Sequence, residues 1–314
     1  MKPLLGTHIA PAGEMESIIA VAGVTGDLGG RIARALVARG AQVRGLLPRT
    51  VPVAETERLA QLGISIVQAD PNDASAMAEA CAGAASVVSA LNGLRPVIIE
   101  RQGVLLDAAV RARVPRFIPS DYAADFTKTT PRENRNFDLR REFMVRADQA
   151  DIQVTSVLNG AFMELLGAQM PIIRRRLRRV LYWGDGPDQA LDFTTKDDVA
   201  AYVAAVALDP HTPRFLRIAG DVVSARAIAN AMSEVTGKRF RTLGVGSIEA
   251  LGTLIRLARA LAPAPADVFS PWQGMQYLRD MYSGKGKLQP LDNDRYPELT
   301  WTKVPTLLRA AADR

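Results

Sequence analysis

Three evenly spaced glycines near the start of the chain constrain its fold more than any other feature. The short apolar run Ile18–Ala22 leads directly into Gly23, Gly26 and Gly29, and a helical pattern follows at once and stops at Gly40. A strand, a glycine turn and a helix in this order place backbone N–H groups and a helix N-terminus where a pyrophosphate binds. A surface turn with loose glycines is the alternative, and the flanking strand and helix patterns disfavour it. We therefore predict a dinucleotide site at Gly23, Thr25, Gly26, Asp27, Leu28 and Gly29.

The second strand indicates which dinucleotide binds. Gln42–Leu47 is followed by Pro48 and Arg49, and no Asp or Glu at its end could accept a ribose 2′-hydroxyl. Arginines, Arg44 and Arg49, stand there instead, and a cation suits a 2′-phosphate. We predict NADP(H) rather than NAD, with a solvated loop residue as the alternative role for Arg49.

Strand and helix patterns alternate through the first half of the chain. Apolar runs predict strands at 18–22, 42–47, 64–68, 86–91, 116–119 and 154–158, and amphipathic stretches predict helices near 28–38, 74–82, 96–113 and 135–150. Such alternation predicts an α/β fold with a Rossmann-like, doubly wound parallel sheet. Ligands bind beyond the carboxyl ends of these strands. The residues expected to meet the cofactor there are Asp70, Leu91, Asn92, Pro119, Ser120, Asp121, Asn159 and Phe162.

The second half of the chain is less regular and predicts a smaller substrate lobe. A helix should open at Thr195, and further helices are expected near 224–236, 247–261, 272–282 and 303–313. We predict a flexible leader over 1–16, a nucleotide-binding domain over 17–160 and mainly the substrate-binding lobe over 161–314. The chain is expected to cross between the two parts more than once.

Composition excludes several classes of protein. No apolar run reaches 18 residues and the first 16 residues lack a signal-peptide pattern, so we expect no membrane span and a cytoplasmic location. With one cysteine and two histidines, neither an internal disulfide nor a zinc site is expected, and Cys81 is predicted to be a buried thiol. The basic run 174–179 is predicted to be a solvated helix face, and nucleic-acid binding is not expected.

Several motifs together resemble the NmrA-like and isoflavone-reductase-like group of atypical short-chain dehydrogenases. The segment Arg116-Phe117-Ile118-Pro119-Ser120-Asp121-Tyr122 is the most specific. The glycine turn, Asn159 with Phe162, Gly184-Asp185-Gly186 and Tyr296-Pro297-Glu298 also match that group. The resemblance implies a Rossmann-like NADP-binding domain, a small C-terminal lobe and a cleft between them.

One departure from that group bears on catalysis. Its reductases carry a lysine where this chain has Arg140, and none of the six tyrosines has a lysine four residues further on. Because an arginine stays charged at neutral pH, it cannot accept a proton, although it can orient a cofactor or polarise an acceptor oxygen. Proton transfer would then come from another group. Tyr122 is predicted to be that acid, with its pKa lowered by Arg140, and packing against the cofactor is its alternative role.

Asn159 is expected either to bind cofactor or substrate, or to cap the following segment. Apolar residues of the lobe, with Phe162, Trp272 and Met275 foremost, are proposed to line a substrate site, and packing in the core is the alternative for most of that stretch. These observations favour an NADPH-dependent reductase of a small apolar carbonyl, quinone or aromatic substrate. The alternative is a non-catalytic NADP(H) redox sensor that acts through a protein partner. A homodimer is also possible under either hypothesis.

Overall fold

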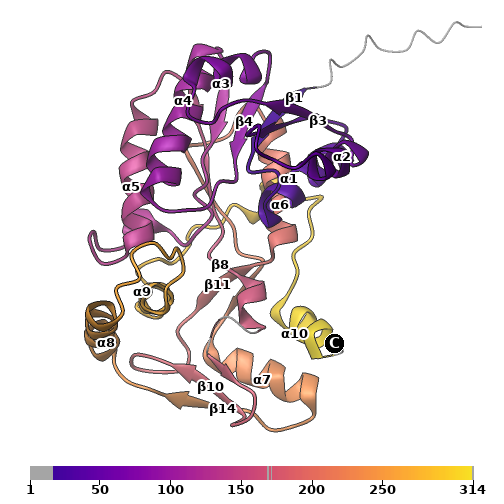
Figure 1. Cartoon of the computed structure of the whole chain (residues 1–314). Coiled ribbons are helices and arrows are strands. Elements are labelled where there is room, and N and C mark those ends of the chain that lie inside the picture. Colours follow the sequence, from indigo (N-terminus) through magenta and orange to yellow (C-terminus); the bar gives the residue numbers. More distant parts are fainter. Residues whose placement is uncertain (1–16, 168–169, 171, 313–314) are drawn as a thin grey trace, which may run out of the picture.

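The computed structural model describes residues 17–167, 170 and 172–312, and the predicted leader over 1–16 lies outside this part. A six-stranded parallel sheet forms its upper half in Figure 1, and a smaller lobe lies below. The sheet strands are β1 (Ile18–Ala22), β2 (Gln42–Leu47), β3 (Ile64–Gln68), β4 (Ser86–Ser89), β5 (Arg116–Ile118) and β6 (Gln153–Val154). Their order is β3-β2-β1-β4-β5-β6. The chain therefore adds β2 and β3 on one side of β1 and then β4, β5 and β6 on the other side.

Helices cover both faces of this sheet, which explains why its strands are apolar on both sides. On one face lie α1 (Asp27–Ala38), α2 (Val53–Gln61) and α6 (Lys196–Leu208), packed against Ile19 and Val21. On the other lie α3 (Ala74–Cys81), α4 (Gln102–Arg111), which continues the π-helical segment η1 (Pro96–Arg101), and α5 (Arg135–Asp148), packed against Ala20 and Ala22. This arrangement confirms the predicted Rossmann-like fold.

A separate pair of parallel strands follows the main sheet after Thr155. The strand predicted over 154–158 is divided into β6 and β7 (Ser156–Leu158), and β7 pairs with β12 (Phe215–Arg217) rather than with the main sheet. The Thr155 hydroxyl lies 2.7 Å from that of Thr212 and 2.9 Å from the Pro213 carbonyl. The Thr155 side chain therefore contacts the loop before β12, and the strand changes its partner from β5 to β12 at this residue. Because β12 and α6 both come after residue 160, the second half of the chain contributes elements to the nucleotide-binding domain.

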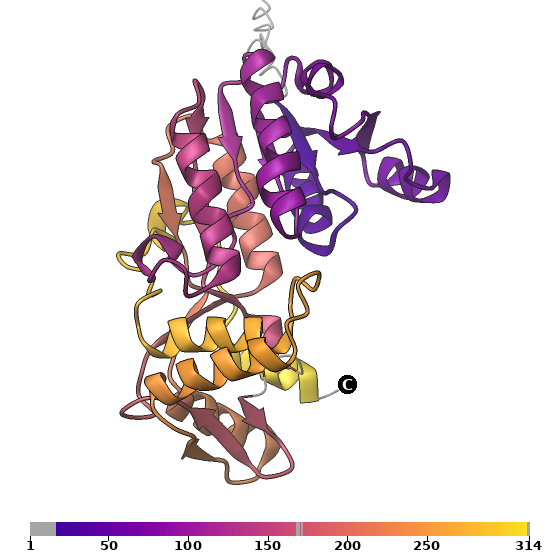
Figure 2. The same ribbon diagram turned by 60° about the vertical axis from the view of Figure 1, so that its left-hand side comes forward.

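The lobe has its own core around Phe193, Ile228 and Met232. Its helices are α7 (Ala225–Thr236), α8 (Ile248–Leu261), α9 (Pro271–Tyr282) and α10 (Val304–Ala312). The chain also forms short 3₁₀ segments, η2 (Phe126–Lys128), η3 (Met163–Leu166) and η4 (Asn293–Arg295). Its strands are β8 (Ala161–Phe162), β9 (Ile173–Arg174), β10 (Arg179–Tyr182), β11 (Leu191–Thr194), β13 (Asp221–Val223) and β14 (Arg241–Gly244). Figure 2 shows α8 and α9 side by side beneath the lower end of α5.

Two local predictions need correction. The basic run 174–179 is not a helix face, because β9 and β10 form an antiparallel hairpin and its arginines surround the turn, with Arg178 at φ 52°. The sequence pattern does not predict the helix α2, since only Leu59 among its residues is buried and its apolar pattern is correspondingly weak.

Candidate cofactor and active site

The glycine turn joins β1 to α1 in a conformation that excludes side chains at two of its positions. Gly23 has φ 84°, and a Cβ there would lie 2.7 Å from the Ala90 carbonyl oxygen. A Cβ at Gly29 would overlap the Gly23 carbonyl. The Gly26 N–H donates to that same carbonyl at 2.9 Å, and no side chain caps α1. The turn is therefore tightly closed, and the N-terminus of α1 keeps the open N–H groups that an anion binds.

Asp27 lies in the turn as predicted, but its carboxylate already has cationic partners. It contacts Arg31 at 2.7 Å and Lys196 at 2.6 Å, and Arg31 also contacts Asp197. These hydrogen bonds lower the pKa of Asp27 and join the N-termini of α1 and α6. We therefore retain only the backbone N–H of Asp27 as a candidate phosphate ligand. Lys196, which sequence reasoning missed, adds a cation beside the turn and lies 5.9 Å from the Phe162 ring centroid.

The two arginines predicted to meet a 2′-phosphate lie in different places. Arg49 is exposed just beyond the end of β2. Arg44 lies in mid-strand opposite Ala20, and its guanidinium donates to the carbonyls of Ala80 and Ala82 at 2.9 and 2.7 Å. Arg44 thus satisfies the C-terminus of α3, which corrects its assignment, and Arg49 is the remaining candidate.

Several residues predicted to touch the cofactor instead hold the loops in place. The Asp70 carboxylate accepts from the Asn72 N–H at 2.9 Å and so stabilises the turn after β3. The Ser120 hydroxyl donates to the Leu91 carbonyl at 2.6 Å, so it joins the loops after β4 and β5. Leu91 and Pro119 lie in these loops, Pro119 is buried and Asn92 is exposed. Their main chains and the Asn92 side chain stay candidates for cofactor contact.

Beyond β5 and β7, buried polar atoms without partners gather from three elements. The atoms are Asp121 Oδ1, Tyr122 Oη, Arg140 Nε and both side-chain polar atoms of Asn159, none of which has a hydrogen-bond partner within the described ranges. Each such atom costs about 1–3 kcal/mol if it stays unpaired. Their concentration at the carboxyl ends of neighbouring strands makes this region the candidate site.

Two of these residues are held firmly by their neighbours. Asp121 is fully buried, and its Oδ2 accepts from the Ser156 hydroxyl at 2.6 Å. Asn159 is also fully buried, its N–H donates to the Ala123 carbonyl at 2.9 Å, and its carbonyl accepts from Thr194. The Asn159 side chain caps no helix in the part of the chain that the structure describes, so the predicted capping role is not seen and its role in ligand binding stays a prediction.

Burial changes which group can serve as the acid. Desolvation, with Asp121 nearby, raises the pKa of Tyr122 far above its usual value. The predicted lowering by Arg140 is therefore wrong. Desolvation also raises the pKa of Asp121, against the opposing effects of the Ser156 hydrogen bond and of Arg140 and Arg214. Of the two buried groups, the carboxyl group is the stronger acid and therefore the better candidate for the proton donor. Sequence reasoning placed Asp121 near the cofactor but had no signal for its burial.

The predicted substrate lining does not come together. Trp272 is 2% exposed, donates from Nε1 to the Pro263 carbonyl at 3.1 Å and is stacked against Arg135 and Arg259. Met275 packs against the lobe core, and Phe162 packs against the core beneath α1 and α6. The three side chains therefore lie in separate environments, because α9 turns its apolar face toward α8 and the lobe core rather than toward Phe162.

Comparison with known proteins identifies the family of the chain. A model of the NmrA-like family matches residues 15–299. The chain belongs to the NmrA-like family. Pinoresinol reductase 1 of Arabidopsis thaliana is 27% identical over 254 residues, which cover 75% of this chain and 80% of that protein. The NmrA-like family domain-containing oxidoreductase ptmS of Penicillium ochrochloron is 25% identical over 256 residues, which cover 73% of this chain and 76% of that protein.

Solved structures agree on the fold of this NmrA-like protein. AtPrR2 with NADP+ and (+)pinoresinol superposes with a TM-score of 0.80 at 22% identity, covering 96% of this chain and all of that one. A NADPH-dependent quinone oxidoreductase from Escherichia coli complexed with NADPH gives a TM-score of 0.71 at 19% identity, covering 94% of this chain and all of that one. At these identities the likeness confirms the Rossmann-like architecture.

Three local features of the residues that the structure describes concern membranes, metals and the single thiol. No helix there is both long and apolar enough to span a membrane. No cluster of three or more His, Cys, Asp or Glu side chains suited to a metal occurs there either. Cys81 is a free, buried cysteine, and burial raises the pKa of its thiol to about 11.

Proposed function

We propose that this NmrA-like protein binds NADP(H) at the glycine turn and acts as an NADPH-dependent reductase of a small, largely apolar carbonyl or quinone. The observation that carries the proposal is the group of unpartnered buried polar atoms on Asp121, Tyr122, Arg140 and Asn159. A turn closed to side chains and an uncapped α1 stand beside them, and both fit a dinucleotide. The curated relatives, a named reductase and a named oxidoreductase, support the same class of reaction.

Each residue has a distinct part in this proposal. Backbone N–H groups of the turn and the dipole of α1 hold the pyrophosphate, and Arg49 pairs with the 2′-phosphate. Asn159 offers one donor and one acceptor that match a carboxamide. NADPH, when bound, would supply the hydride.

The charge that develops on the acceptor oxygen is stabilised by Arg140, which donates to the Asn136 carbonyl at 3.2 Å and keeps Nε without a protein partner. Asp121 donates the proton. A quinone suits a site with a fixed cation, because its reduction creates an oxyanion and requires no lysine base.

The test combines titration with turnover. Isothermal calorimetry should detect NADPH binding, and absorbance should show steady NADPH oxidation with a panel of neutral quinones and enones. Asp121→Asn should lower kcat with little change in NADPH affinity, while Asn159→Ala should weaken NADPH binding. A protein that binds NADPH but oxidises it with no acceptor across the panel would contradict the reductase proposal.

Arg140 also favours one alternative, a non-catalytic NADP(H) sensor, because it stands where the family's reductases are expected to have a lysine. Such a sensor would discriminate NADP+ from NADPH in affinity, would retain a protein partner and would show no turnover. A cytoplasmic location and assembly as a homodimer or with a regulatory partner stay predictions.

A further inference from the structure

A cavity of about 630 Å³ lies between the N-terminal half of α5, the loop after β4 and the C-terminal end of α8 with the loop that follows it. Arg95, Arg132, Arg135 and Arg259 line it, together with the carboxylates of Asp138 and Glu142. Its volume is within the range of small-molecule sites, and the concentration of arginines is its distinguishing feature.

The two carboxylates of the cavity neutralise only one of its four arginines. Glu142 pairs with Arg95 through two contacts of 2.7 and 2.5 Å. Asp138 pairs with Arg141 at 2.7 Å, and Arg141 is not part of the lining. Arg132, Arg135 and Arg259 are left without an ion pair to any residue that the structure describes, so the cavity carries a surplus of positive charge.

Two of these three guanidinium groups lie against the same aromatic ring. Arg135 and Arg259 lie 4.6 and 5.4 Å from the centroid of the Trp272 ring. Arg135 is fixed by hydrogen bonds to the carbonyls of Asp267 and Val268 at 2.7 and 3.2 Å. Burial lowers the pKa of Arg135, and the charge of Arg259 acts in the same direction. The charge of Asp267 opposes the effect of Arg259 on Arg135, and an anion bound near both arginines would further reduce their repulsion.

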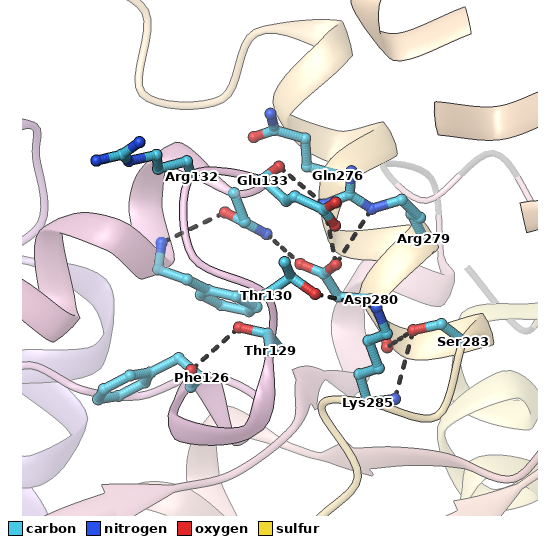
Figure 3. A network of polar contacts seen from close by, with 12 residues as sticks. Phe126, Thr129, Thr130, Arg132, Glu133, Gln276, Arg279, Asp280, Ser283 and Lys285 are labelled. Carbon is cyan, nitrogen blue, oxygen red and sulfur yellow. Dashed lines mark hydrogen bonds and ion pairs between the residues drawn. The ribbon is translucent and has the colours of Figure 1, made fainter. Parts of the chain in front are cut away.

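The third guanidinium group is directed away from the neighbouring polar network. Figure 3 shows the Arg132 side chain extending away from the cluster of Glu133, Arg279 and Asp280. The backbone N–H of Arg132 donates to Asp138 at 2.9 Å, which fixes the loop while leaving the guanidinium free of a carboxylate partner within the described chain. Arg132 can therefore rotate toward a ligand in the cavity.

Two apolar residues of the cavity are close in sequence to residues of the proposed reaction site. Leu94 follows Asn92 at the carboxyl edge of β4, and Leu139 directly precedes Arg140 on α5. We propose that this cavity binds an anionic group of the substrate, a carboxylate or a phosphate ester carried on a flat apolar body. The inference rests on the proposed reductase function and specifies its substrate as an organic anion. Guanidinium forks bind both kinds of oxyanion in a bidentate manner.

Binding of non-reducible probes tests the anion site separately from turnover. We would titrate 2-naphthoate, 2-naphthyl phosphate and neutral 2-naphthol into the NADP+-saturated protein by calorimetry. At least one anion should bind about tenfold or more tightly than 2-naphthol, and the double variant Arg132→Gln with Arg259→Gln should remove about tenfold or more of that preference. Whichever anion binds better identifies the oxyanion. Arg256→Gln is the matched control, because Arg256 is on α8 but does not line the cavity, and it should bind the probes like the wild type.

Turnover then distinguishes the two proposals. With 1,4-naphthoquinone as a neutral acceptor and its 2-sulfonate as an anionic one, the double variant should lower the ratio of kcat/KM for the anionic over the neutral quinone about tenfold. Equal probe binding by wild type and double variant, or 2-naphthol binding as tightly as both anions, would overturn the anion site. Absent NADPH binding in calorimetry would instead refute the proposed function, even if the probes still bound.

Discussion

The variant Gly26→Val tests whether the glycine turn is needed for cofactor binding or only for folding. Gly26 is exposed, and its φ of −76° and ψ of 161° suit any residue. A Cβ there would meet only the Gly23 carbonyl oxygen, at 3.2 Å. Since valine is a poorer N-cap than glycine, we expect a loss of about 1 kcal/mol in the free energy of unfolding.

The expected loss of NADPH affinity is much larger. A branched side chain on the outer face of the turn would keep a pyrophosphate from reaching the N–H groups of α1. If two charge-assisted hydrogen bonds are lost, each worth about 1.5–3 kcal/mol, Kd should rise roughly 10²–10⁴-fold. Isothermal calorimetry with NADPH measures Kd, and urea unfolding measures stability.

Gly40→Ala is the matched control. Gly40 has φ 80°, and no atom lies within 4 Å of the position that a Cβ would take, so alanine there is strained but meets no neighbour. Its cost, roughly 1–2 kcal/mol, equals or exceeds that of Gly26→Val, yet NADPH binding should be retained. Wild-type NADPH affinity in Gly26→Val, or an equal loss in Gly40→Ala, would refute the assignment of the turn.

Three further outcomes are expected. Arg49→Gln should weaken NADPH binding about tenfold in calorimetry while leaving NADH binding unchanged, and equal effects on the two coenzymes would contradict a 2′-phosphate contact. Because the pKa of Asp121 is raised on folding, the carboxyl stabilises the fold most at low pH and loses that contribution as the pH rises through its folded pKa. In urea unfolding, the free energy of unfolding of the wild type minus that of Asp121→Asn should therefore fall as the pH rises above 4, by at most about 1.4 kcal/mol per pH unit. A difference that rises with pH would be inconsistent with the burial of Asp121. Cys81 should react with a thiol reagent only after unfolding, since burial raises its pKa to about 11, and rapid labelling of the native protein would disagree with this placement.

Local signals are sufficient to predict most of the fold. The glycine turn, the apolar strands and the capped helix starts all depend on residues close together in the sequence. Thr195, for example, accepts the Asp198 N–H at 3.1 Å and begins α6 where the pattern predicts. The same holds for Asn134, whose side chain accepts from the Phe137 N–H and begins α5.

The errors at the site arise where the deciding contact lies far away in the sequence. Arg44 has the residue type that a 2′-phosphate requires, but its partners are carbonyls of α3, 36 and 38 residues further on. The sequence shows a charge near Tyr122 but not the burial that dominates its pKa. The sequence correctly predicts that Trp272 lies on a helix, yet the orientation of its side chain depends on the loop after α8, which no periodicity predicts.

Helix α5, which carries Arg140, and helix α9 of the lobe are joined through one buried residue. Asn134 caps α5, donates to Asp280 of α9 at 2.8 Å and accepts from Gln273 of α9 at 2.8 Å. Figure 3 shows the surrounding contacts, in which Arg279 reaches Glu133 and Asp280. Separating α9 from α5 would leave several buried polar groups unpaired at about 1–3 kcal/mol each. The lobe is therefore held in register with the nucleotide-binding domain, so an anion bound in the cavity would be positioned relative to Arg140 by the fold itself.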